Sequence, residues 1–125
     1  MFAAIPFVFA LVVSVGAYEV TIRGFFMCDR DNQTPIFVEL MTLNAFKDDQ
    51  LSWVNTPVYK TFVIKGKKDD FFGFKPYLKV MHRCRGFDET IYVNLPRQRK
   101  DAFIDLGMVD LDDPETRDSV NSKYL

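Results

Sequence analysis

The sequence is short of the residues from which most catalytic and metal sites are built. Its 125 residues include one histidine, His82, and two cysteines, Cys28 and Cys84. A catalytic Ser-His-Asp arrangement would have to use His82, and a zinc site would need a second cysteine pair. The two cysteines are too far apart for the C-x-x-C spacing of a redox motif. This inventory predicts a protein without catalytic residues, metal ligands or cofactors.

The chain also lacks an excess of charge of either sign. It has 16 Lys and Arg residues against 17 Asp and Glu residues, which gives a net charge of −1. Proteins that bind nucleic acids or other polyanions carry a basic surplus, so the balance argues against that class. Two local basic clusters are more typical of solvated turns: Lys65, Lys67, Lys68 and Arg97, Arg99, Lys100. There is no linker, low-complexity tract or internal repeat, which predicts one domain.

Only the N-terminus carries a long apolar run. Residues 1–17 contain no charged side chain, and the run at 5–13 has the length of the hydrophobic region of a signal peptide. It is too short for a bilayer span of about 20 residues. Small residues precede Tyr18 and suit cleavage there, although no basic residue precedes the run, and an uncleaved anchor is the alternative. We therefore predict a signal peptide over 1–17 and a secreted, extracellular domain over 18–125, with no membrane span after cleavage.

Apolar and polar residues alternate along most of this domain, as in half-buried strands. The alternation predicts strands over residues 18–28, 36–43, 58–64, 76–84, 89–95 and 103–109, and a further apolar piece begins at Trp53. Pro57 interrupts that piece and indicates a sheet edge or a bulge. Residues 44–51 are expected to form a loop or a short irregular segment, and 66–70 a turn. The last strand is expected to have Ile104, Leu106 and Met108 on one face. Because no long amphipathic helix is present, the pattern predicts an all-β antiparallel sandwich of about seven strands in two sheets.

Two cysteines in an exported chain most simply pair with each other. A Cys28–Cys84 disulfide would close a loop of about 55 residues and contribute about 4 kcal/mol in the chain-entropy model. His82 shares a strand face with Leu78 and Val80, beside Cys84, and we predict a buried or half-buried structural histidine. On the opposite face of the same strand, Lys79 and Met81 are expected to meet solvent.

Two further features have open interpretations. Asn32-Gln33-Thr34 is an N-glycosylation sequon in an expected turn, although the following Pro35 lowers its acceptance; the alternative is a plain polar turn. Phe71, Phe72 and Phe74 lie close together. They would either line a pocket for a small apolar ligand or belong to the core.

Several segments resemble the nematode transthyretin-like family of secreted proteins. The matching pieces are Val20-Thr21-Ile22-Arg23-Gly24 ending at Cys28, Pro35 with Val38-Glu39-Leu40, Phe62-Val63-Ile64-Lys65-Gly66, Pro76-Tyr77-Leu78-Lys79-Val80-Met81-His82-Arg83-Cys84, Ile91-Tyr92-Val93-Asn94-Leu95-Pro96, Ile104-Asp105-Leu106-Gly107 and Glu115-Thr116-Arg117-Asp118. They follow the family order over most of residues 18–125.

The resemblance implies an exported, immunoglobulin-like β-sandwich similar to transthyretin, with a Cys28–Cys84 disulfide. The second disulfide of many family members is missing, because residues 88–90 and 118–119 contain no cysteine. The related hydroxyisourate hydrolases use a histidine pair and a Tyr-Arg-Gly-Ser ending, neither of which is present here. We therefore predict a non-enzymatic module that binds an extracellular protein or cell-surface partner through loops or a sheet edge. A carrier of a small apolar ligand is the alternative.

Overall fold

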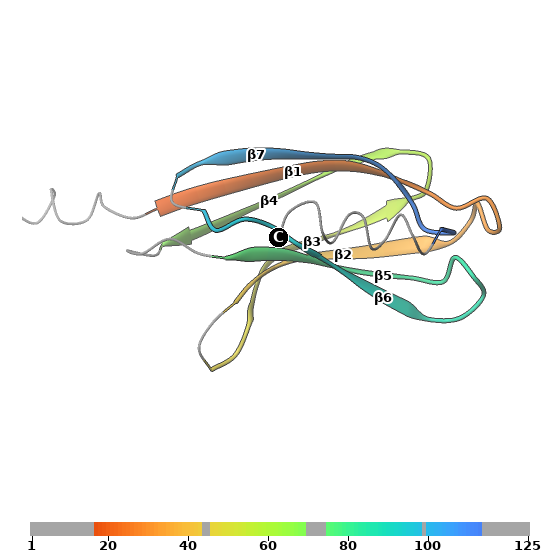
Figure 1. The fold of residues 1–125 in the computed structure, drawn as a ribbon, viewed down its shortest axis with the longest axis horizontal. Coiled ribbons are helices and arrows are strands. Elements are labelled where there is room, and N and C mark those ends of the chain that lie inside the picture. The colour runs from red at the N-terminus through yellow and green to blue at the C-terminus, as the bar shows by residue number, and fades with distance from the viewer. Residues whose placement is uncertain (1–16, 44–45, 70–74, 99, 114–125) are drawn as a thin grey trace, which may run out of the picture.

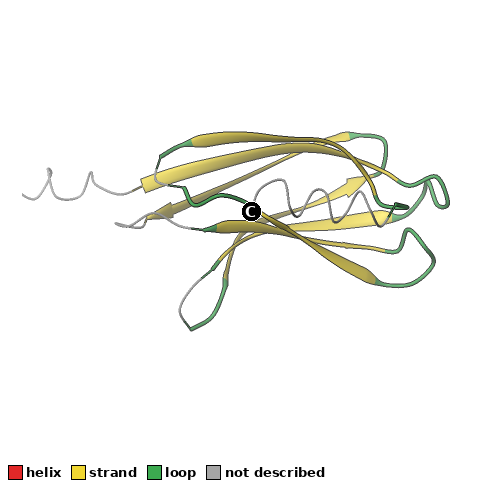
Figure 2. Cartoon of the chain, viewed as in Figure 1, coloured by secondary structure: helices red, strands yellow, loops and turns green. Residues whose placement is uncertain are grey.

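The computed structural model describes residues 17–43, 46–69, 75–98 and 100–113. These residues form seven strands, which are β1 (Ala17–Met27), β2 (Pro35–Thr42), β3 (Asp49–Pro57), β4 (Thr61–Asp69), β5 (Pro76–His82), β6 (Glu89–Asn94) and β7 (Ala102–Asp110). Figure 2 shows strands joined by loops throughout this part of the chain. No helix in the described ranges has the length and apolar character of a membrane span. The expected leader and the Phe71, Phe72, Phe74 cluster lie outside the described residues, apart from Ala17.

The strands form two sheets that stack as the layers of a sandwich (Figure 1). One sheet has three strands in the order β4-β1-β7, and the other has four in the order β3-β2-β5-β6. Neighbouring strands are antiparallel except β1 and β7, which run parallel. The all-β sandwich predicted from the sequence is therefore confirmed. Pro57 is the last residue of β3, which is an edge strand. This position suits proline, because proline has no N–H to donate to a hydrogen-bond ladder.

The core lies between the sheets and is made by alternate residues of each strand. Val20 and Ile22 of β1 face Val38, Leu40, Leu78 and Val80 of the opposite sheet, and all are fully buried. Strand β6 adds Ile91 and Val93. Because side chains alternate across a strand, burying one set sends the intervening residues to the outer faces of the sandwich.

The turn predicted at 66–70 is wrong for the described residues 66–69. Strand β4 continues through them to Asp69 and pairs with β1 as far as Ala17. Gly66 allows Leu40 and Leu51 to pack closely against the strand, since a Cβ atom on it would lie 2.6 Å from Leu40 Cδ2 and 2.9 Å from Leu51 Cβ. The actual turn lies earlier, around Tyr59, whose φ is 59°. The loop expected at 44–51 is likewise too long, because β3 begins at residue 49.

Strand β7 corrects a second prediction, that Met108 lies on the same strand face as Ile104 and Leu106. Its register against β1 shifts between the pairs Arg23–Asp105 and Phe25–Met108, which marks a β-bulge. Gly107 adopts a φ of 71° at this point, a conformation that glycine tolerates best. The bulge reverses the alternation, so that Met108 is 69% exposed and Val109 is buried.

Candidate interaction site

The outer face of the four-stranded sheet gathers aromatic and methionine side chains from all four strands. The strand register aligns Trp53, Glu39, Lys79 and Tyr92 in one row across β3, β2, β5 and β6. Neighbouring rows contribute Phe37 with Met81 and Met41 with Tyr77. We call this surface the aromatic face; its members are Phe37, Glu39, Met41, Trp53, Tyr77, Lys79, Met81 and Tyr92.

Two aromatic pairs stand on either side of the central Glu39 and Lys79. The ring centroids of Phe37 and Trp53 are 5.6 Å apart, and those of Tyr77 and Tyr92 are 6.2 Å apart. Trp53 is 56% exposed and Tyr92 is 47% exposed. The aromatic face therefore presents apolar rings to solvent at both edge strands, with opposite charges between them.

A cleft lies at each end of the aromatic face. One has a volume of about 450 Å³ and is lined by Phe37 and Met81, with Arg83, Asp88 and Glu89 among its charged residues. The other, which we call the tyrosine cleft, has a volume of about 330 Å³ and is lined by Leu43, Asp48, Tyr77, Tyr92 and Asn94. Both clefts lie outside the packed core, so they are surface features of the sandwich.

Tyr77 and Asp48 form a polar contact within the tyrosine cleft. The Tyr77 hydroxyl donates a hydrogen bond of 2.6 Å to Asp48 Oδ2. Burial of the phenol, together with this hydrogen bond and the carboxylate charge, raises the pKa of Tyr77 to about 12. The phenol therefore keeps its proton above pH 10 and acts as the donor in this hydrogen bond.

The raised pKa of Tyr77 predicts a loss of stability in alkali. In the unfolded chain the phenol ionises near its ordinary pKa of 10.0, whereas the folded protein holds the proton up to about pH 12. The stabilising contribution is complete below pH 10 and is lost as the pH rises from 10 to 12. We expect the urea midpoint of the native protein to fall more between pH 9 and 11.5 than that of Tyr77→Phe. Equal falls in the two proteins would contradict the assignment.

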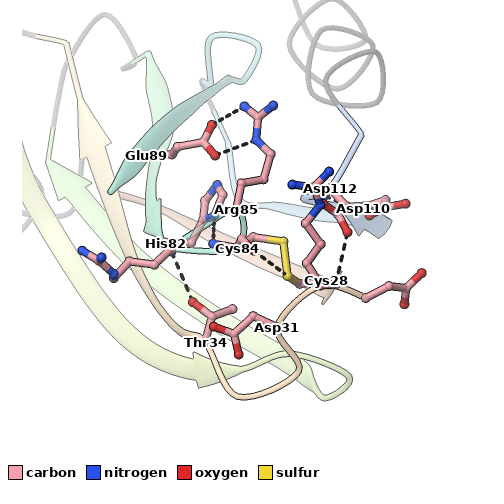
Figure 3. The surroundings of a disulfide bond; sticks show 12 residues. Cys28, Asp31, Thr34, His82, Cys84, Arg85, Glu89, Asp110 and Asp112 are labelled. Carbon is pink, nitrogen blue, oxygen red and sulfur yellow. Dashed lines mark hydrogen bonds and ion pairs between the residues drawn. A yellow bond between two sulfur atoms is a disulfide. The ribbon is translucent and has the colours of Figure 1, made fainter. Parts of the chain in front are cut away.

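The predicted disulfide is confirmed and lies at the end of the sandwich drawn in Figure 3. Cys28 and Cys84 are buried, and their Cα atoms are 5.9 Å apart. His82 is 3% exposed, and its Nδ1 accepts a hydrogen bond of 3.0 Å from the Cys84 backbone N–H. The Arg85 guanidinium binds the Glu89 carboxylate through two hydrogen bonds of 2.7 and 2.8 Å, which braces the turn after Cys84.

Other candidate residues lie near this end of the molecule. Asn32 is exposed in the β1–β2 turn, and the Thr34 hydroxyl is buried and accepts a hydrogen bond from the Arg83 backbone N–H. Asp112 places a carboxylate oxygen within 4.8 Å of the two cysteine sulfurs. Both sulfurs are held in the disulfide, so they offer no thiolate to a metal ion.

Sequence reasoning found part of the aromatic face and missed its organisation. It placed Lys79 and Met81 on an outward strand face, and both are half-buried there among aromatic rings. It did not bring Phe37, Trp53 and Tyr92 together, because that requires the register of four strands. The available signal was the type of residue at each outward position: Phe37, Trp53 and Tyr92 replace the polar residues typical of a solvated face.

Comparison with known proteins gives one family. The model of the transthyretin-like family matches residues 23–96 of the chain. A search of the curated proteins gives no match. Among solved structures, the pilus-presented adhesin Spy0125 (Cpa) is similar to 78% of this chain, with 9% sequence identity and a TM-score of 0.31. The chain covers 28% of that adhesin.

Proposed function

The chain belongs to the transthyretin-like family, and we propose that it is a secreted, non-enzymatic module that binds an extracellular or cell-surface protein through the aromatic face. The observation that carries the proposal is the exposure of Trp53 and Tyr92 on either side of Glu39 and Lys79. Protein interfaces are enriched in Trp, Tyr, Phe and Met, and exposed apolar patches mark interaction sites. The central charges would fix the register of a partner with complementary charges.

Export is supported by the apolar leader and by the disulfide. Disulfides persist in oxidising compartments and are rare in the cytosol. The absence of enzymatic activity is supported by the environment of the single histidine. The His82 ring is buried, and its Nδ1 is used in a structural hydrogen bond with the backbone of Cys84.

A carrier of a small apolar ligand is the second candidate, favoured by the cleft beside Phe37 and Met81. This cleft has the volume of a small-molecule site, about 450 Å³. Arg83, Asp88 and Glu89 contribute to its walls, however, and a purely apolar ligand would leave such charged groups without partners. A cleft with charges of both signs beside exposed rings suits the surface of a protein partner better than it suits a small apolar ligand. The interaction module is therefore the function we propose.

In the experiment, the secreted protein and two single variants are each used as bait in extracellular fluid. Bound partners are captured by cross-linking, and the affinity of each partner for the native protein and for the two variants is then measured. Trp53→Ala removes the most exposed ring of the aromatic face and is expected to weaken partner binding about tenfold or more, as for an interface hot spot. Phe103→Ala is the matched control, because Phe103 is 63% exposed on the other sheet. This variant is expected to bind the partner as the native protein does.

Two results would overturn the proposal. One is equal affinity of the native protein and Trp53→Ala for every captured partner. The other is recovery of the full-length chain in membranes rather than in the medium. Secreted material is expected to begin at Tyr18, as read by N-terminal sequencing.

A further inference from the structure

We propose that the tyrosine cleft is a binding site for a quaternary ammonium group. Its walls come from segments that are distant in the sequence: Tyr77 is the second residue of β5, Tyr92 lies in β6, and Asp48 precedes β3. The proposed ligand is a small organic cation, so the inference goes beyond the protein-binding role of the aromatic face.

The two tyrosine rings form a corner suited to a cation. Their centroids are 6.2 Å apart and their planes meet at 52°. A cation is attracted to an aromatic face when it lies within about 6 Å of the ring centroid. An ion seated in the corner can satisfy this condition for both rings at once. Aromatic corners of this kind are a known means of recognising quaternary ammonium ions.

The charge of the cleft has the sign that such a ligand needs. Asp48 places its carboxylate against the Tyr77 hydroxyl, which donates a hydrogen bond and brings no charge of its own. Glu39 lies on the same face, close enough for its charge to act on Tyr77. Lys79 is the cation that the register places beside Glu39 and Tyr92, and it is half-buried on the sheet rather than part of the cleft lining.

The lining favours an alkylated cation over a bare ammonium. Leu43 and the two tyrosine rings offer mainly apolar surface, and the cleft of about 330 Å³ has room for a small organic ion. A lysine-type ammonium is strongly hydrated and brings three donors, which would need three acceptors in the cleft. A quaternary ammonium brings no donor and packs methyl groups against the rings. The sequence alone could not indicate this site, because its residues come from three separate segments.

The test is a titration of the secreted protein with choline, followed by the NMR signals of the tyrosine rings and by calorimetry. Saturable binding that shifts the Tyr77 and Tyr92 signals is expected. The neutral isostere 3,3-dimethylbutan-1-ol has the same shape without the charge, and it is expected to bind at least about tenfold more weakly. Phosphocholine and an acetylated trimethyllysine amide are titrated in parallel, and the tighter of the two identifies the source of the ammonium group.

Matched variants separate the site from a general effect of charge. Asp48→Asn and Tyr92→Leu are each expected to weaken choline binding about tenfold. Asp29→Asn removes the same charge beside Tyr59, at another tyrosine–aspartate contact, and is expected to leave binding unchanged. Each variant must keep the native urea midpoint within error. The proposal is overturned if choline gives no saturable shift, if the neutral alcohol binds equally well, or if Asp29→Asn weakens binding as much as Asp48→Asn.

Discussion

Replacing Cys28 and Cys84 together by alanine is expected to lower the free energy of unfolding by about 4 kcal/mol. The disulfide joins residues 56 positions apart, so it restricts a long loop of the unfolded chain. A domain of this size has a total stability of about 5–15 kcal/mol. The loss is therefore a large fraction of the whole, and we also expect a lower yield of folded protein.

Alanine is the suitable replacement because both cysteines are almost completely buried. A serine hydroxyl at either site would add the free-energy cost of a buried polar group to the loss of the bridge. Urea unfolding of the oxidised native protein, the two single variants and the double variant measures the effect. The double variant is expected to be no less stable than either single variant, because one substitution already removes the bridge.

Reduction provides the control for this prediction. The native protein unfolded and refolded in excess reductant is expected to show the stability of the double variant, since its thiols can no longer form the cross-link. Thiol labelling of the native protein should find no reactive cysteine. Two labelled cysteines, or equal urea midpoints for the native and double-variant proteins, would refute the prediction.

The sequence predicted the strands better than their ends. Period-2 alternation is imposed by burial of one face, so it located β1, β2, β5 and β6. Turn composition was misleading at residues 66–69, where Gly-Lys-Lys-Asp forms the end of β4. The pairing of β4 with β1 overrides the local preference, and Gly66 permits the close approach to Leu40 and Leu51.

Other features depend on contacts that no local pattern records. The bulge at Gly107 changes which side of β7 is buried, and it is set by the register against β1. The aromatic face depends on the alignment of four strands, and the tyrosine cleft adds Asp48 from a loop. The disulfide was accessible from sequence for a simple reason: with two cysteines, only one intramolecular pairing exists.

Phe26→Ala is expected to lower the free energy of unfolding by about 3–5 kcal/mol, as for other large-to-small changes in a core. Phe26 is 1% exposed and stacks on Phe62, with ring centroids 5.0 Å apart and planes inclined by 2°. Gly24 makes room for this stack, because a Cβ atom there would lie 2.7 Å from Phe62 Cε1. The neighbouring backbone is thus already close to the rings and leaves little room for Phe62 to move, so truncation should leave a cavity.

Two comparisons make the Phe26 prediction specific. Phe26→Leu retains most of the buried apolar volume and is expected to lose less stability than Phe26→Ala. Phe103→Ala removes a ring of the same size from a position that is 63% exposed, and the expected change is within about 0.5 kcal/mol. Urea unfolding of the three variants measures the differences. A Phe26→Ala loss no larger than that of Phe103→Ala would show that the stacked pair does not anchor β1 and β4 in the core, and the packing between the sheets would have to be reassigned.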